Sequence, residues 1–172
     1  TNVLHYEALR LAVKMAKSRN DSAAAVRYQG DADALRAAID AHFWREDRGL
    51  YMSYIGPADG PHTIEAYDLL GTSLAILADI PAPERAHKAL ANYPTWPAGS
   101  PVIWPEHHDV AIYHNRAIWP FVSAYALRAA RKVNDPARIA HEIRSVMRGA
   151  ALYGSNMENY ELLTQGQHVD DG

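Results

Sequence analysis

Residues 94–121 read PTWPAGSPVIWPEHHDVAIYHNRAIWPF, a long loop that separates two helical pairs. The loop holds three of the four tryptophans and three of the nine histidines of this 172-residue chain, beside an Asn, an Arg and two carboxylates. A packed core does not need this mixture, because buried polar groups cost free energy unless each finds a hydrogen-bond partner. A pocket for a polar, ring-shaped ligand does need it, since aromatic faces cover the ring while amides, imidazoles and carboxylates match its hydroxyls. We therefore expect a carbohydrate ligand.

Apolar side chains at helical spacing on both sides of this loop predict six helices. The expected helices span residues 2–18, 22–43, 64–78, 83–91, 115–133 and 136–153. Gly30 marks an expected break, because glycine is unfavourable inside a helix. Alternating residues over 44–55 indicate a short extended hairpin.

Long loops follow alternate helices, so the helices form consecutive pairs. This repetition predicts an all-α fold of antiparallel hairpins, in a toroid or solenoid whose linking loops line one face. A free-standing helical bundle is the simpler alternative.

The overall composition excludes several classes of partner and chemistry. With 48% hydrophobic and 22% charged residues, the chain has the composition of a globular domain with a real core. Its net charge of −3 provides no basic field, so we expect no nucleic-acid partner and no association with membranes. Cysteine is absent, which removes thiolate nucleophiles and cysteine metal sites. We expect neither a cofactor nor a metal.

Acidic side chains in two segments are candidates for catalysis. Glu158 and Glu161 follow the last predicted helix in the segment MENYELLTQG, where an acid is most often solvated surface. The functional alternative is a carboxylate that activates water, which needs a second carboxyl group nearby. Glu106 and Asp109 in the aromatic loop are more easily explained as groups that bind sugar hydroxyls.

The remaining polar and aromatic side chains of the loop have two interpretations each. His107, His108 and His114 with Asp109 are residue types that bind divalent ions. Adjacent histidines point in divergent directions, however, so hydrogen bonding to sugar or to neighbouring loops is the favoured interpretation. Trp104 is either a core anchor or a ligand contact.

Two further positions have the same kind of ambiguity. Trp119 at a helix start is either a core anchor or a ligand contact, as Trp104 is. Asp68 precedes an apolar helix, and an N-terminal capping role explains it. Contact with a ligand is the alternative for Asp68.

Four segments in this order resemble the six-hairpin glycosidases, the superfamily of (α/α)6 barrels. FWREDRGLYMSYI (43–55) resembles the W-x-x-x-x-G-x-Y signature of this superfamily, and DLLGTSLAIL (68–77) resembles the helix that follows it. SPVIWPEHHDVAIYHNRAIWPF (100–121) resembles its G-P-I-W and Y-H-N-x-x-I-W-P-F segments. MENYELLTQGQ (157–167) resembles the E-N-Y-x-x-x-T-G motif of processing α-glucosidases and their bacterial relatives.

The resemblance implies that residues 1–172 form the C-terminal part of one (α/α)6 catalytic domain, three of its six hairpins. It implies a glycoside hydrolase that inverts configuration, with Glu158 as general base and the general acid supplied by an N-terminal part. By the same resemblance, the side chains that line the sugar pocket are Trp104, His114, Asn115 and Trp119. We also expect Glu106, His107 and Tyr160 to contact the substrate.

The expected partners are a carbohydrate substrate and the N-terminal remainder of the barrel, in the same or another chain. Two alternatives stay open. One is a non-catalytic carbohydrate-binding helical protein, and the other is a polysaccharide lyase on the same toroid that uses Tyr113 and His114 for proton abstraction. A periplasmic or secreted bacterial location is slightly favoured over a cytoplasmic one.

Overall fold

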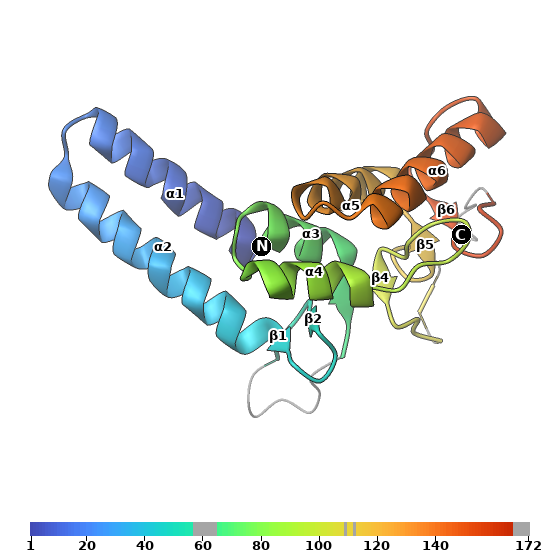
Figure 1. Cartoon of the computed structure of the whole chain (residues 1–172), viewed down its shortest axis with the longest axis horizontal. Helices are drawn as coiled ribbons and strands as arrows, with labels where there is room; N and C mark the ends of the chain where they lie inside the picture. The colour runs from blue at the N-terminus through green and yellow to red at the C-terminus, as the bar shows by residue number, and fades with distance from the viewer. Residues whose placement is uncertain (57–64, 109, 112, 167–172) are drawn as a thin grey trace.

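The computed structural model describes residues 1–56, 65–108, 110–111 and 113–166, and helices dominate this part of the chain (Figure 1). The helices are α1 (Asn2–Ser18), α2 (Ser22–Phe43), α3 (Leu69–Leu77), α4 (Pro83–Asn92), α5 (Pro120–Lys132) and α6 (Pro136–Tyr153). The short strands are β1 (Trp44–Arg45), β2 (Leu50–Tyr51), β3 (Tyr67–Asp68), β4 (Ile103–Trp104), β5 (Ala117–Ile118) and β6 (Tyr160–Glu161). The mostly helical fold predicted from the sequence is confirmed.

Consecutive helices pack in pairs. Helix α1 lies along α2, and the two form a long hairpin that extends away from the other elements (Figure 1). Helix α5 lies along α6, while α3 packs against α5 and so joins the second and third pairs. The arrangement of these pairs as part of a toroid stays a prediction.

The strands form three two-stranded antiparallel ladders, which connect the loops at one end of the helices. Strand β1 pairs with β2, β3 with β4, and β5 with β6. The hairpin expected over residues 44–55 is therefore present as β1 and β2. The other two ladders join segments far apart in the chain, and the sequence did not predict them.

The core beneath these ladders lies around α3 and α5. Tyr67, Leu69, Trp119, Val122 and Ala126 are buried together there. Helix α3 is apolar on nearly all its faces, as expected for a buried helix. Side chains from the strands and from the helix starts therefore share one core, so the loops that leave this core are held in place.

Two helices begin later than their apolar pattern predicted. Helix α3 begins at Leu69 instead of residue 64, which lies outside the described residues, because Asp68 caps the helix by accepting hydrogen bonds from the amides of Leu70 (2.8 Å) and Gly71 (3.1 Å). Helix α5 begins at Pro120 instead of residue 115, because the preceding residues form β5.

The break expected at Gly30 is absent. Helix α2 is continuous from Ser22 to Phe43, and a Cβ atom at Gly30 would meet nothing within 4 Å. Packing along α1 compensates for the low helix propensity of one exposed glycine.

A buried ion pair connects α6 to the aromatic loop. Arg138 Nε donates to Glu142 Oε1 at 2.8 Å, and Arg138 Nη2 donates to the Ser100 hydroxyl at 3.1 Å. Arg138 also donates to the carbonyls of Leu90 and Tyr93 at the end of α4. Both charged side chains are buried, Arg138 at 6% and Glu142 at 0% exposure. The pair therefore fixes the first part of the loop against α4 and α6.

We predict that Glu142→Ala lowers the free energy of unfolding by about 3–5 kcal/mol, because it leaves the Arg138 guanidinium buried without its carboxylate. Urea unfolding measures the change. Glu7→Ala is the matched control, since Glu7 pairs with Arg10 on an exposed helix face and its loss costs less than about 1 kcal/mol. Equal losses in the two variants would contradict this account.

Candidate functional site

The β5–β6 ladder brings the segment after α6 against the end of the aromatic loop. Ala117 pairs with Glu161 and Ile118 with Tyr160. Glu158 precedes β6, and the Tyr113 hydroxyl donates a hydrogen bond of 3.3 Å to its Oε1 across 45 residues of sequence. Glu158 is exposed, so this carboxylate is available to a ligand.

Three rings form an aromatic surface beside Glu158. The His114 imidazole stacks on the Trp119 indole with ring centroids 4.7 Å apart and planes 4° from parallel. Tyr113 meets both rings edge-on. The Trp119 indole is buried, and its N–H donates to the Tyr113 carbonyl at 2.9 Å. We call Tyr113, His114, Trp119 and Glu158 the Glu158 site.

Asn115 holds the loop that carries this site. Its side-chain amide donates to the carbonyls of His107 (2.9 Å) and Val110 (3.0 Å), and its Oδ1 accepts from the His107 amide at 2.9 Å. Both amide hydrogens are used inside the loop, and the side chain is buried. A supporting role therefore explains Asn115 and the backbone of His107, while substrate contact by either stays a prediction.

The Arg116 guanidinium contacts two carboxylates, Glu106 in the aromatic loop and Glu161 on β6. Its Nε donates to Glu161 at 2.9 Å, and its Nη1 lies 3.6 Å from Glu106. The second Glu161 oxygen accepts hydrogen bonds from the Leu163 and Thr164 amides and from the Thr164 hydroxyl.

These contacts decide the charge state of Glu161. Burial raises its pKa, but the hydrogen bonds from Thr164, Arg116 and Leu163 outweigh burial and lower the pKa to about 2. Glu161 is therefore a fixed anion that holds the turn, and Glu158 is the acid of this segment that is open to solvent.

Tyr160 and Trp104 lie beneath the surface of the site region. Tyr160 is 1% exposed, stacks on Tyr153 and accepts a hydrogen bond from the Met157 amide. A Cβ at Gly149 would stand 2.7 Å from the Tyr160 ring, so α6 approaches this ring closely. Half-buried Trp104 stacks on Tyr67 with centroids 5.6 Å apart. These positions support the loops, and direct substrate contact by either ring stays a prediction.

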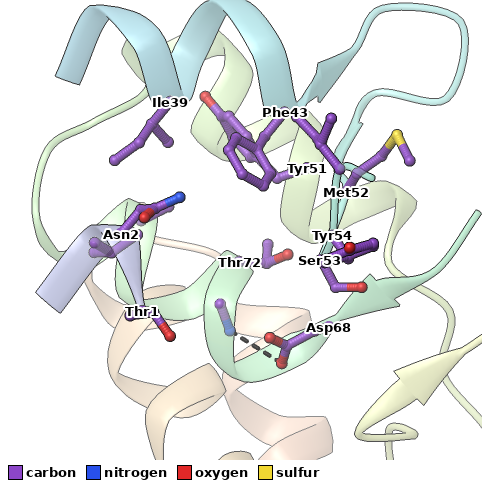
Figure 2. Close-up of a pocket in the computed structure, with 14 residues that line it drawn as sticks. Thr1, Asn2, Ile39, Phe43, Tyr51, Met52, Ser53, Tyr54, Asp68 and Thr72 are labelled. Atoms are coloured by element: carbon purple, nitrogen blue, oxygen red, sulfur yellow. Dashed lines mark hydrogen bonds between the residues drawn. The ribbon is translucent and has the colours of Figure 1, made fainter. Parts of the chain in front are cut away.

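Two cavities lie near these residues. Trp104, Glu106 and Arg116 line a small one of about 80 Å³. A larger cavity of about 320 Å³ lies between the start of α1, the end of α2, β2 and α3, with Asp68 and Thr72 on its wall (Figure 2). Burial raises the pKa of Asp68, against the lowering effects of the hydrogen bonds from the Gly71 and Leu70 amides.

Sequence reasoning placed Glu158, His114 and Trp119 in one sugar pocket and named Tyr113 only in the lyase alternative. It did not predict the hydrogen bond from Tyr113 to Glu158. Thr72 was missed, although it and Ser73 are hydroxyl residues within a mostly apolar helix. Asp109, a candidate group for binding sugar hydroxyls, lies outside the described residues. Within the described ranges, no three His, Asp or Glu side chains gather as metal ligands, and no helix has the length and hydropathy to span a bilayer.

No protein-family model matches the chain. Over 92 residues it is 30% identical to N,N'-diacetylchitobiose phosphorylase of Vibrio furnissii, a match that covers 51% of this chain and 12% of that protein. The fold resembles part of a sialidase structure with a TM-score of 0.72 and 17% identity, over 97% of this chain and 17% of that one. The chain thus spans less than a fifth of either protein, and the structural match shows likeness of fold alone.

We predict that Glu161→Gln removes a pH-dependent part of the stability. A carboxyl group whose pKa falls on folding stabilises the native state above its unfolded pKa, near 4.5, and this contribution is lost as pH falls toward 2. The wild-type protein should therefore exceed the variant in unfolding free energy at pH 6, and this difference should shrink below about pH 4.5. Urea unfolding across this range measures it. A difference that stays constant with pH would contradict the assignment, and the exposed Glu84→Gln serves as control.

Proposed function

We propose that this chain is part of a carbohydrate-processing enzyme whose sugar pocket includes the Glu158 site. The observation that carries the proposal is the exposed Glu158 carboxylate, bonded to Tyr113 beside the His114–Trp119 stack. A flat ring surface beside a carboxylate and a phenol suits a sugar, which has apolar C–H faces and hydroxyls at its edge. The partial match to a chitobiose phosphorylase supports the same class of substrate.

Glu158 is proposed as the general base of a hydrolysis with inversion. It takes a proton from a water molecule as that water attacks the anomeric carbon, and the leaving oxygen receives a proton from a second carboxyl group. Such a pair stands roughly 6.5–9.5 Å apart, which leaves room for the water. We assign the general acid to a part of the enzyme outside residues 1–172. The Tyr113 hydrogen bond would hold the Glu158 carboxylate in place for this step.

Phosphorolysis is the second candidate reaction, because the relative matched over 92 residues is a phosphorylase. Phosphate would then replace water as the nucleophile and would need no general base. Glu158 would in that case bind sugar hydroxyls. The two reactions differ in product, since hydrolysis of a disaccharide gives two free sugars, whereas phosphorolysis gives one sugar 1-phosphate and one free sugar.

We predict that Glu158→Gln in the full-length enzyme lowers kcat about 100-fold or more with little change in KM, because the amide cannot accept the proton. The assay uses N,N'-diacetylchitobiose and a panel of other disaccharides, each with and without inorganic phosphate. Glu84→Gln, at an exposed position on α4, is the control that should keep full activity.

Each alternative has its own outcome in this assay. Full activity of Glu158→Gln removes the assignment of the base. Phosphate-dependent release of a sugar 1-phosphate selects phosphorolysis. Polysaccharide cleavage that yields unsaturated, ultraviolet-absorbing products and requires Tyr113 selects a lyase, and sugar binding without turnover selects a non-catalytic binding protein.

We also propose that another helical hairpin covers the outer face of α1, supplied by the N-terminal remainder of the barrel in the same or another chain. Leu4, Leu11 and Met15 recur on one face of α1 and are 58%, 52% and 62% exposed. An apolar stripe of this kind is typical of an interface. The short coverage of the two relatives supports a larger assembled enzyme.

We predict that Met15→Glu lowers the unfolding free energy of the full-length enzyme by about 2 kcal/mol or more, because it places a charge in a covered apolar interface. The neighbouring exposed Lys14→Glu is the matched control and should change this free energy by less than about 0.5 kcal/mol. Similar small effects in both variants would show that the α1 face stays in water.

A further inference from the structure

The 320 Å³ cavity beside α3 has one apolar wall and a small group of polar side chains (Figure 2). Ile39 and Phe43 from α2 and Ala75 from α3 form its apolar part. Asp68 and Thr72 face them from the first turns of α3, one helical turn apart. A concave space of this kind, mostly apolar with a few convergent polar groups, is typical of a small-ligand site.

The Thr72 hydroxyl is the clearest sign of a missing ligand. Thr72 is 1% exposed, and its Oγ1 has no hydrogen-bond partner in the described part of the chain. A helical threonine normally donates to a carbonyl in the preceding turn, as Ser73 does to Leu69 at 2.6 Å. The Thr72 side chain is directed into the cavity in Figure 2, so a group inside the cavity can satisfy it.

Asp68 adds an acceptor to the same wall. Its Oδ1 accepts from the amides of Leu70 and Gly71. For its Oδ2, no hydrogen bond is found within the described residues, and this oxygen lies on the side of α3 that Gly71 leaves open. A free carboxylate oxygen and a hydroxyl about one helical turn apart can bind two hydroxyl groups of one ligand.

We propose that this cavity binds one ring of a neutral sugar through Asp68 and Thr72, with the ring's C–H face against Phe43. The volume is at the small end of the roughly 300–1,000 Å³ of ligand pockets, which fits a single ring. The choice of ligand class rests on the proposed carbohydrate function.

Charged ligands fit this wall less well. The α3 amides that would bind an anion are already used by Asp68, whose own charge repels an anion. An ammonium group carries three donors, whereas Asp68 and Thr72 together offer it one free carboxylate oxygen and one hydroxyl. A neutral ring with hydroxyls at its edge matches both the polar and the apolar parts of the cavity.

Thr72→Val tests the proposal in the full-length protein, because valine keeps the shape of threonine and removes only the hydroxyl. We expect it to weaken sugar binding about 3- to 10-fold while the melting temperature stays equal or rises, since an unpaired buried hydroxyl is lost. Ser123→Ala is the matched control. Ser123 on α5 has another buried hydroxyl without a partner in the described residues, but it does not line the cavity.

Asp68→Asn is the second variant, because asparagine keeps the capping oxygen and removes the charge. We expect it to weaken binding about 10-fold or more. Dissociation constants for glucose, galactose, mannose and N-acetylglucosamine are measured by saturation-transfer NMR titration, with glucosamine as the cationic comparison.

Weaker binding in Thr72→Val and Asp68→Asn, with wild-type binding in Ser123→Ala, supports the sugar subsite. Binding that Thr72→Val leaves unchanged, binding of none of the four neutral sugars, or a preference for glucosamine overturns it. The proposed function is tested separately by turnover. Loss of turnover in Glu158→Gln together with an empty cavity would leave that function standing and remove only this subsite.

Discussion

The antiparallel pairing of Ala117–Ile118 with Tyr160–Glu161 is the contact on which the Glu158 site depends. It brings the segment that carries Glu158 against the end of the aromatic loop, where Tyr113 donates to Glu158. The Arg116–Glu161 ion pair reinforces the ladder, and the low pKa of Glu161 keeps that pair charged at all physiological pH values. Glu161, which has a structural role, thus positions Glu158 three residues earlier in the chain.

The helices were predictable because their signals are local. Apolar spacing, Pro83, Pro136 and the cap at Asp135 specify them without reference to the rest of the chain. The starts of α3 and α5 were not predictable, since partners far away in sequence decide them. Tyr67 pairs with Trp104, and Ile118 pairs with Tyr160, so residues that look helical become strands.

The candidate site was likewise predictable from its local residue types but not from its long-range contacts. Residue types and the family resemblance identified Glu158, His114 and Trp119, but the hydrogen bond from Tyr113 to Glu158 exists only in the folded chain. Asn115 and Tyr160 have structural roles in holding loops that the sequence did not predict, and their contact with substrate stays a prediction. Asp68 combines both roles, as a cap for α3 and a wall of the cavity. Polar side chains that keep an atom without a hydrogen-bond partner in the folded chain are therefore the ones that indicate a ligand site.

The crystal structure of the full-length Glu158→Gln enzyme, with the disaccharide that the wild type turns over, tests the central claim most directly. We expect a sugar ring over the His114–Trp119 stack, with the side chain of residue 158 within hydrogen-bond distance of the sugar or of a water below its anomeric carbon. A sugar bound elsewhere, with another part of the protein packed over His114 and residue 158, would contradict it.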